Sequence, residues 1–298
     1  MKKQNSLNSG FFLILLAGVL WGGMGLFVRR LSALGFDPLQ ITAGRLSFAA
    51  LFFLLLLVLR PAQERCVRLR DLPLFLGLGL ASILFFTVCY FSAIEIMPLS
   101  TAAILLYTSP IWVTLLSALL FREKLTPTKQ LALAMAFGGC VLVSGVGGGG
   151  LTPRGLLFGL GAGLGYGLYS ILGSVALRRY SPYTVTACTF LIAAVGACCI
   201  CRPAAMLSTL LSAPSPLGTL LFFVLTAFVT AVVPFLCYTL GLRSVEAGKA
   251  AILATVEPMV ASLLGVAVFH EALTPLSALG ILLILAAVIL LSLPKKDL

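Results

Sequence analysis

The chain of 298 residues carries little charge: Asp, Glu, Lys and Arg together account for 10% of it, and histidine occurs once. Charged residues make up about a quarter of an ordinary soluble domain. Hydrophobic residues reach 60%, and the mean hydropathy is +1.14. Side chains of this composition could not cover the surface of a domain in water, so the solvent must be lipid. We therefore expect an integral membrane protein that lies in a lipid bilayer.

Residues suited to metal or cofactor chemistry are also scarce. The eight cysteines lie mostly within apolar runs, and the single His270 completes no metal-ligand spacing with them. The sequence has no Walker A motif, and its longest polar stretch, 60–71, is too short for a soluble domain. We expect no metal, no cofactor and no ATP-binding domain, and we do not expect an enzyme.

The net charge is +11, which in a soluble protein would indicate a nucleic-acid partner. Here the basic residues lie between the apolar runs, where the distribution of Lys and Arg sets the orientation in the membrane. With the amino terminus inside, most of these residues fall on the cytoplasmic side. We therefore predict that both termini are cytoplasmic and that no nucleic acid is bound.

Ten apolar runs are long enough to cross a hydrocarbon core of about 30 Å as helices. The first run follows Lys2 and Lys3, as in a signal peptide, but no cleavage pattern ends it, so we expect an uncleaved span. The predicted spans cover residues 10–28, 38–59, 72–94, 99–121, 128–146, 154–175, 183–201, 217–241, 247–269 and 275–293.

The sequence contains two copies of one unit. Residues 102–127 and 250–275 align without a gap at an offset of 148, and both end in Phe-x-Glu-x-Leu-Thr-Pro. Each copy has five spans, and an odd number of spans inverts the second copy in the membrane. The predicted domains are a first five-helix repeat over 1–146, a Gly-rich connector over 147–153 and a second, inverted repeat over 154–298.

Glycines recur on one face of the first and sixth spans. They are Gly18, Gly22 and Gly25 in the first span, and Gly155, Gly159, Gly163 and Gly167 in the sixth. Small residues permit the close backbone approach on which helix association in lipid depends. We expect the first and sixth spans to be interior, and the fifth and tenth, which carry no intramembrane charge and few polar groups, to face lipid.

Three prolines interrupt apolar runs and are candidate hinges or kinks: Pro110, Pro234 and Pro258. Each removes one backbone hydrogen bond from its helix. Pro110 and Pro258 occupy matching positions of the two copies, and interrupted helices at matching positions point to a substrate site. A plain packing kink would give the same pattern.

Two charged residues lie within spans. Glu257 falls near the middle of the membrane, where a charge costs roughly 2.5–3.5 kcal/mol on insertion scales. It should therefore contact substrate, carry a proton, or fill the kink at Pro258 as a hydrogen-bonded structural group. Arg45 lies closer to the outer surface, where it could snorkel or form a fixed ion pair. Alternatively, it provides a counter-charge for a substrate carboxylate or for Glu257.

Aromatic residues on the expected interior helices are candidates for the wall of a substrate cavity. They are Trp21, Tyr90, Tyr107, Tyr166 and Tyr238. Tyrosines often form a belt at the membrane surface, but Tyr107 is mid-span and too deep to do so. An aromatic chamber that contains Glu257 would suit an organic cation through cation–π contacts.

The sequence resembles the EamA-type transporters of the drug/metabolite transporter superfamily. The resemblance rests on Leu-Trp-Gly-Gly at 20–23, Arg45, Phe-Arg-Glu-Lys-Leu-Thr-Pro from Phe121, Val-Glu-Pro at 256–258 and Phe-His-Glu-Ala-Leu-Thr-Pro from Phe269. It extends over nearly the whole chain. The first repeat departs from the second at Ser109, which stands where the second repeat has Glu257, so only one half carries the acid.

The resemblance implies a central cavity lined by helices one to four and six to nine, alternating access by rocking halves, and a place in the bacterial inner membrane. We expect a secondary-active transporter, an exporter, of small metabolites such as amino acids, amines or amphipathic drugs. An uncoupled, channel-like facilitator is the alternative, because coupling to protons would depend on Glu257 alone. The substrate, the coupling ion, the direction and the oligomeric state stay open.

Overall fold

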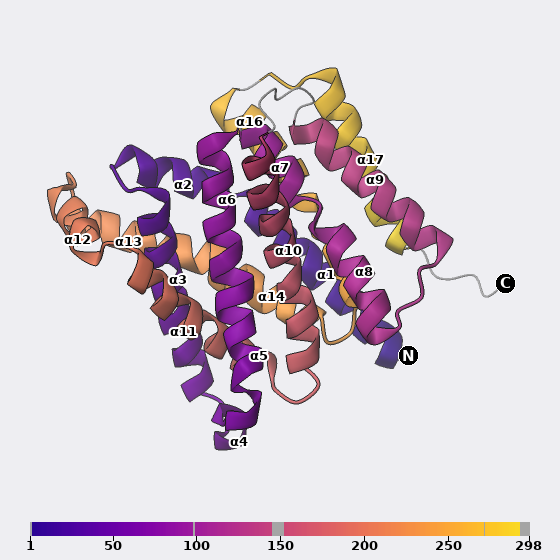
Figure 1. The fold of residues 1–298 in the computed structure, drawn as a ribbon, viewed down its shortest axis with the longest axis horizontal. Coiled ribbons are helices and arrows are strands. Elements are labelled where there is room, and N and C mark those ends of the chain that lie inside the picture. Colours follow the sequence, from indigo (N-terminus) through magenta and orange to yellow (C-terminus); the bar gives the residue numbers. More distant parts are fainter. Residues whose placement is uncertain (1, 98, 145–151, 271, 293–298) are drawn as a thin grey trace.

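The computed structural model describes residues 2–97, 99–144, 152–270 and 272–292, and this part of the chain is helical without strands (Figure 1). In chain order the helices are α1 (Lys2–Gly22), α2 (Met24–Ala33), α3 (Pro38–Val58), α4 (Ala62–Arg65), α5 (Leu72–Leu76), α6 (Phe85–Ile96), α7 (Leu99–Leu106), α8 (Ser109–Phe121), α9 (Pro127–Ser144), α10 (Pro153–Ala176), α11 (Pro182–Ile200), α12 (Pro203–Ser212), α13 (Pro216–Ala227), α14 (Val233–Gly241), α15 (Ala247–Leu253), α16 (Val256–Phe269) and α17 (Pro275–Ser292). A 3₁₀ turn, η1 (Leu69–Asp71), and two π-helical segments, η2 (Gly77–Leu84) and η3 (Phe228–Val232), complete the described elements.

The all-α membrane fold class is confirmed. Within the described residues, nine helical segments are long and apolar enough to cross a membrane, and they correspond to nine of the predicted spans. The remaining predicted span, 128–146, is the helix α9, whose first turn is polar because it contains Lys129 and Gln130. The end of this span and most of the predicted connector, 147–153, lie outside the described residues. The short apolar helix α12 has no counterpart among the predicted spans.

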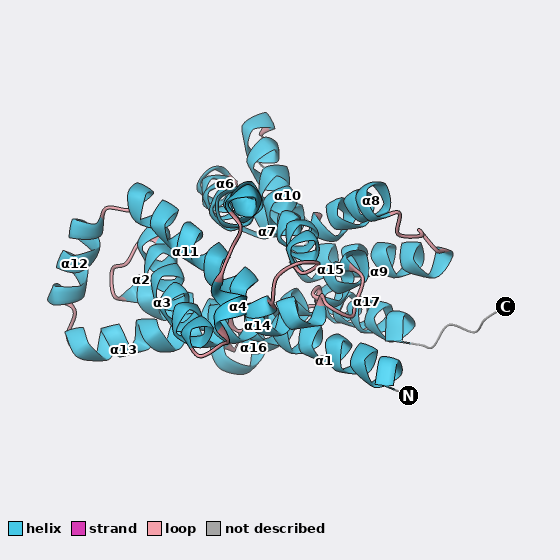
Figure 2. Cartoon of the chain, turned by 90° about the horizontal axis from the view of Figure 1, so that it is seen from below, coloured by secondary structure: helices cyan, strands magenta, loops and turns pink. Residues whose placement is uncertain are grey.

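The two halves interlock through equivalent helices. The second helices, α3 and α11, pack against each other, and so do the last helices, α9 and α17, which lie side by side at one edge (Figure 2). The first helix of each half instead crosses to the other half: α1 packs on α14, α15 and α16, whereas α10 packs on α6, α7 and α8. This exchange is what two inverted repeats related by a twofold axis in the membrane plane produce.

Glycines allow this exchange because they remove the side chains that would hold the backbones apart. A Cβ atom at Gly163 of α10 would lie 2.7 Å from the carbonyl oxygen of Leu105, and one at Gly22 of α1 would lie 2.6 Å from the carbonyl oxygen of Glu257. Both distances are too short for real atoms. Gly25, predicted to belong to the same row, lies beyond the break between α1 and α2, and no atom approaches its Cβ position within 4 Å.

The fourth spanning element of each half is broken at the corresponding place. The chain leaves helical order between α7 and α8 and again between α15 and α16, and Pro110 and Pro258 lie in the first turns of the helices that follow. The carbonyl of Ala254, which Pro258 deprives of its usual donor, accepts the backbone N–H of Glu257 at 3.0 Å. These broken helices are the elements on which the glycine faces of α1 and α10 rest.

The third spanning element of each half contains a π-helical segment, η2 in the first half and η3 in the second. Pro234 follows η3 directly, in the first turn of α14. Because π-helical segments are rare and occur frequently at functional sites, their presence in both halves favours a functional role for these helices.

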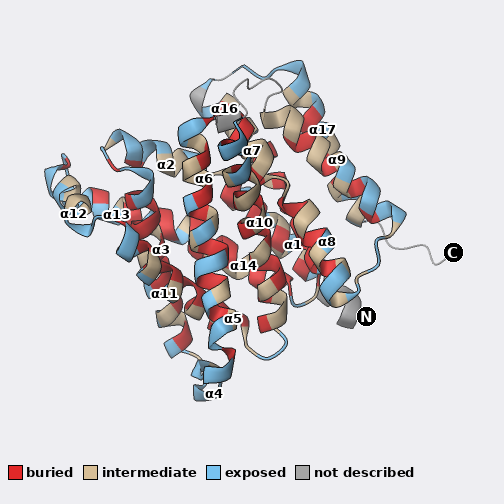
Figure 3. Ribbon diagram, viewed as in Figure 1, coloured by how far each residue is buried: buried red, intermediate tan, exposed pale blue. Residues whose placement is uncertain are grey.

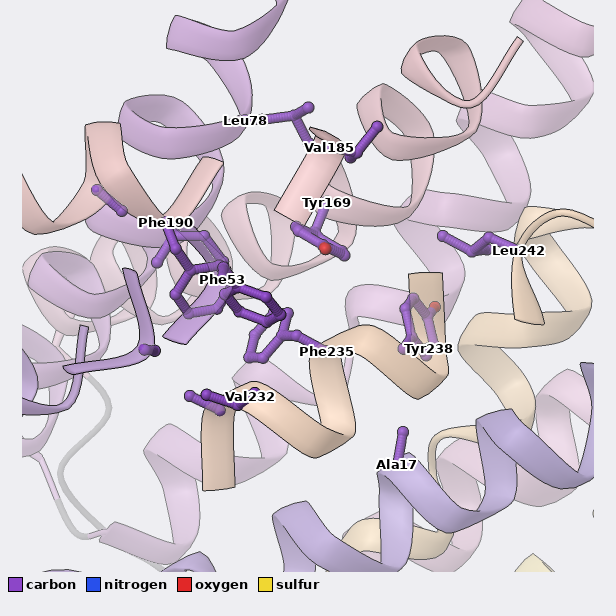
Figure 4. Packing of buried hydrophobic residues seen from close by; sticks show 14 of the residues in the cluster. Ala17, Phe53, Leu78, Tyr169, Val185, Phe190, Val232, Phe235, Tyr238 and Leu242 are labelled. Atoms are coloured by element: carbon purple, nitrogen blue, oxygen red, sulfur yellow. The ribbon is translucent and has the colours of Figure 1, made fainter. Parts of the chain in front are cut away.

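Buried residues concentrate where the two halves meet, and exposed apolar residues cover the outside (Figure 3). Phe53, Phe190 and Phe235, from α3, α11 and α14, form the centre of the core, with neighbouring ring centroids 4.9 Å apart (Figure 4). On α17, by contrast, Leu282 is 62% exposed and Ile289 is 58% exposed. An apolar outer surface of this kind requires lipid to cover it.

We predict that Gly163→Ala destabilises the protein by about 1–3 kcal/mol, because the added methyl group must push the backbone of Leu105 away. Gly138→Ala in α9 is the matched control. No atom lies within 4 Å of the Cβ position there, so alanine should be neutral or stabilise by about 0.5–1 kcal/mol through its better helix propensity. Thermal unfolding of the purified protein in one detergent measures both. Equal melting temperatures for the two variants would contradict the close approach.

Candidate functional site

A narrow cavity lies where the first helices of both halves meet the broken helices. Its wall is contributed by α1, η2, α6, α8, α10, α14 and α15. The lining is mainly aromatic, with serine hydroxyls between the rings: Trp21, Ser82, Phe86, Ser109, Tyr166, Tyr169, Ser170, Phe235 and Tyr238 belong to it. Its volume is about 20 Å³, which is room for about one water molecule. A metabolite therefore requires this cavity to widen.

Trp21 is the centre of the aromatic wall. Its ring lies 5.0 Å from that of Phe235, 5.4 Å from that of Tyr238 and 6.2 Å from that of Tyr166, measured between centroids. Trp21 comes from the first half and its three neighbours from the second, so the wall exists only because α1 crosses over. Edge and tilted ring contacts of this kind each add to the energy of apolar burial.

Glu257 is held next to this wall by Tyr166, whose hydroxyl donates a hydrogen bond of 2.9 Å to the Glu257 carboxylate. Glu257 lies in the first turn of α16, directly after the break in the helix. Its backbone is the part of α16 that contacts Gly22 of α1. Glu257 itself lies behind the cavity, and Tyr166 connects it to the cavity wall.

Arg45 lies near enough to Glu257 for the two charges to interact, but the structure joins them by no direct ion pair. Among the described residues, the Arg45 guanidinium donates one hydrogen bond, of 2.7 Å, to the sulfur of Met24. Sulfur is a weak acceptor, and a guanidinium has five donors. Arg45 therefore keeps donors that an anionic group could use.

Tyr90 and Tyr107 lie close to Glu257 but outside the lining of this cavity. Both lie within range of the Glu257 charge. The ring of Tyr90 stacks at 6.2 Å on that of Phe86, which does line the cavity. Tyr107, in the break between α7 and α8, packs instead with a cluster that contains Cys140. Both tyrosines surround the acid rather than the aromatic chamber in this conformation.

Two hydrogen bonds fix α10 against α14 at the base of the cavity. The hydroxyls of Tyr169 and Thr239 lie 2.7 Å apart, as do those of Ser170 and Tyr238. Thr239 also donates to the carbonyl of Phe235, so Tyr169 is the donor to Thr239. Tyr169, Ser170 and Phe235 were not among the predicted site residues. Tyr169 and Ser170 follow Tyr166 by three and four positions, so the helical period could have indicated them.

Ser82 and Ser109 also line the cavity; the comparison of the repeats had pointed to Ser109, whereas no sequence pattern indicated Ser82. Ser82 lies in η2 and is 1% exposed, and its hydroxyl has no hydrogen-bond partner among the described residues. Such a hydroxyl normally finds a partner in a folded protein. Ser109, which stands where the second repeat has Glu257, begins α8 beside the same cavity. The cavity thus has polar groups from both copies, whereas the acid behind its wall comes from the second copy alone.

The described residues contain no cluster of His, Cys, Asp and Glu that could hold a metal ion. The eight cysteines occur as free thiols distributed over the molecule.

The fold and this site define a class of protein: a multi-pass integral membrane protein of two interlocked repeats, with its polar and aromatic residues gathered where the repeats meet. This is the architecture of secondary transporters. The model of the EamA-like transporter family matches the chain twice, over residues 8–145 and 153–293. The chain belongs to the EamA-like transporter family, as its resemblance to EamA-type drug/metabolite transporters had indicated.

Similar proteins agree with this assignment. A protein of Archaeoglobus fulgidus described as an uncharacterized transporter is 34% identical over 283 residues, which cover 93% of this chain and 94% of the relative. The uncharacterized transporter YwfM of Bacillus subtilis is 27% identical over 290 residues, covering 95% and 94%. A solved crystal structure aligns over 96% of both chains with a TM-score of 0.77 at 21% identity, which shows the shared fold. The chain is therefore a membrane transporter.

Removing a buried hydroxyl should affect stability differently according to whether that hydroxyl has a hydrogen-bond partner. Ser82→Ala removes a buried hydroxyl without a partner, so we expect a melting temperature equal to or above that of the parent. Thr239→Val keeps the shape but leaves the Tyr169 hydroxyl without its acceptor, at a cost of about 1–3 kcal/mol. Thermal unfolding in detergent measures both. A loss of stability in Ser82→Ala as large as that in Thr239→Val would show that Ser82 has a structural partner after all.

Proposed function

We propose that the protein is a secondary-active exporter of small amines and amino acids that works by alternating access. The observation that carries the proposal is Glu257, a carboxylate in the middle of a membrane helix that is oriented by Tyr166 beside an aromatic cavity. A carboxylate behind aromatic rings suits an ammonium group, through charge and cation–π attraction together. Arg45, not ion-paired with Glu257, supplies a positive group for the carboxylate of an amino acid.

The size of the cavity supports alternating access. A volume of about 20 Å³ cannot hold even a small amine, so the halves must separate locally for substrate to enter. The elements around the cavity are suited to such movement. The breaks before Pro110 and Pro258 and the segments η2 and η3 interrupt regular helical hydrogen bonding next to the cavity wall.

Proton coupling follows from competition for one group. A cationic substrate and a proton cannot both occupy the Glu257 carboxylate, so one must leave before the other binds. A proton replaces the amine at Glu257 on the outer side of the membrane, and an amine replaces the proton on the cytoplasmic side. Inward movement of protons thereby drives outward movement of the amine. This scheme needs a single acid, in agreement with Ser109 at the equivalent position of the first half.

We place the protein in the bacterial inner membrane with both termini in the cytoplasm. The support for this orientation is the excess of Lys and Arg in the loops that would then be cytoplasmic. The family likeness supports the location by analogy. A tag at either end, probed from each side of the membrane, tests the orientation directly.

The test of the function is proton-coupled flux in liposomes. A thermal-shift screen of amines and amino acids first identifies a ligand, because a ligand that binds the folded state raises its melting temperature. Flux of that ligand is then measured with and without a pH gradient for the parent protein, for Glu257→Gln and for Glu64→Gln. Glu64 is an acid of the short helix α4 that does not line the cavity, and it serves as the matched control.

We expect a pH gradient to accelerate flux through the parent and through Glu64→Gln, and we expect Glu257→Gln to lose this dependence. The pH gradient is imposed in each direction in turn. Uptake against efflux of the ligand under each gradient shows whether protons and ligand move in opposite directions, as export requires. Unchanged, gradient-driven transport by Glu257→Gln would contradict the proposal. If flux through the parent is also independent of the pH gradient, the result would favour the uncoupled facilitator.

A further inference from the structure

One end of the molecule is bound together by charged and aromatic side chains from both halves. This is the end that carries α4 in Figure 1. The helices α3, α8 and α10 end there, and α9, α11 and α15 begin there. Among the described residues, three groups of charged and aromatic side chains join the halves there. None of them belongs to the aromatic cavity or to its acid.

The first group surrounds Asp71 of the first half. Arg179 forms an ion pair of 2.8 Å with one carboxylate oxygen, and the hydroxyl of Tyr180 donates a hydrogen bond of 2.6 Å to the other. The backbone N–H of Arg68 donates to the same Tyr180 hydroxyl at 3.2 Å. Arg179 and Tyr180 belong to the second half, so the carboxylate of Asp71 ties the two halves together.

The second group is centred on Lys129 of α9, whose side chain is only 1% exposed. Its ammonium group lies 2.6 Å from the carboxylate of Glu123 in its own half and 3.7 Å from that of Glu246 in the other half. Glu246 directly precedes α15, and Gly248 lets the lysine approach that helix, since a Cβ there would meet the ammonium group. A buried lysine is rare unless it is paired, so these carboxylates hold it in place.

The third group consists of arginines over aromatic rings. The guanidinium of Arg60 lies 3.5 Å from the ring centroid of Tyr183, and that of Arg178 lies 5.0 Å from that of Phe121. Each pair joins one residue from each half. Because Phe121 ends α8 and Arg178 directly precedes Arg179, this contact also connects the first two groups. An exposed ion pair alone contributes little, but a connected network that includes a buried lysine contributes more.

The opposite end of the same bundle is hollow. A cavity of about 590 Å³ opens there between the start of α3, the end of α6 and the end of α11. Asp37, Glu95 and Arg202 are the charged residues in its lining. The end with the three groups of contacts has a smaller cavity, of about 320 Å³, which lies between α1, α15 and α17 and outside those contacts. A transporter with inverted halves must close one end while the other is open.

We propose that the contacts of Asp71, Lys129 and Arg60 form a latch, which selects the conformation closed at this end and must break for each transport cycle. The inference rests on the proposed function, because only a protein that alternates access needs to open this end. With the predicted orientation, the latch is the cytoplasmic gate and the hollow end faces outward. Weakening the latch shifts the population toward the conformation that is open at the latched end.

Hydrogen–deuterium exchange of the full-length protein in lipid nanodiscs tests the latch without a substrate. The variant is Asp71→Asn with Glu246→Gln, which removes charge from the two groups that include ion pairs. Arg70→Gln, an exposed neighbour of Asp71, is the matched control. Asp71→Asn alone is a milder second variant, and gel filtration and thermal unfolding establish that each protein is folded.

We expect reciprocal changes. Amide exchange should become several-fold faster in residues 60–71, 177–184 and 242–249, and slower in residues 88–95 and 198–202, because the hollow end closes as the latched end opens. Faster exchange at the latched end alone, or at both ends, would show that the contacts only fasten loops and would overturn the proposal. No change would overturn it too. The result is independent of flux through Glu257→Gln, so failure of the latch and failure of the proposed function are distinguishable.

Discussion

Close backbone contact between the two halves is the constraint on which the rest of the structure depends. In lipid there is little hydrophobic drive for helices to associate, so packing must come from van der Waals contact at short range. Gly22 and Gly163 provide it, since each brings a first helix against carbonyl oxygens of the other half's broken element. The exchange of α1 and α10 therefore puts both helix breaks beside the shared interface. Any cavity at that interface must be built by both halves.

The two halves are alike in backbone but different in chemistry at the point where they meet. Arg122 and His270 end α8 and α16 in the same left-handed conformation, with φ of 55° in both, which shows how closely the copies correspond. In the first turn of the corresponding helices, Ser109 stands where the second half has Glu257. In the proposed alternating-access cycle, this asymmetry leaves Glu257 as the single acidic binding group.

Hydropathy and the repeat predicted the spans, the inversion and the matching breaks, because each depends on residue type and spacing along the chain. The helix α12 was missed because ten apolar residues are too few to cross a membrane. The segments η2 and η3 leave no compositional signal.

The residues that line the cavity depend on how each helix is rotated about its axis, which the sequence pattern does not give. Tyr107 has the right depth but packs with Cys140, whereas Trp21 and Tyr238 line the chamber. The assignment of site residues to substrate stays a prediction.

The most direct test of the proposed function, in which an amine binds in the aromatic cavity centred on Trp21, is tryptophan fluorescence. The chain has two tryptophans, so Trp112→Phe leaves Trp21 as the single emitter. The Trp112 indole nitrogen is buried without a hydrogen-bond partner among the described residues, so phenylalanine should be tolerated. A ligand found by thermal shift should change Trp21 emission saturably, at concentrations that match the shift in melting temperature. Unaltered emission while the ligand still raises the melting temperature would contradict the account, because binding would then lie elsewhere.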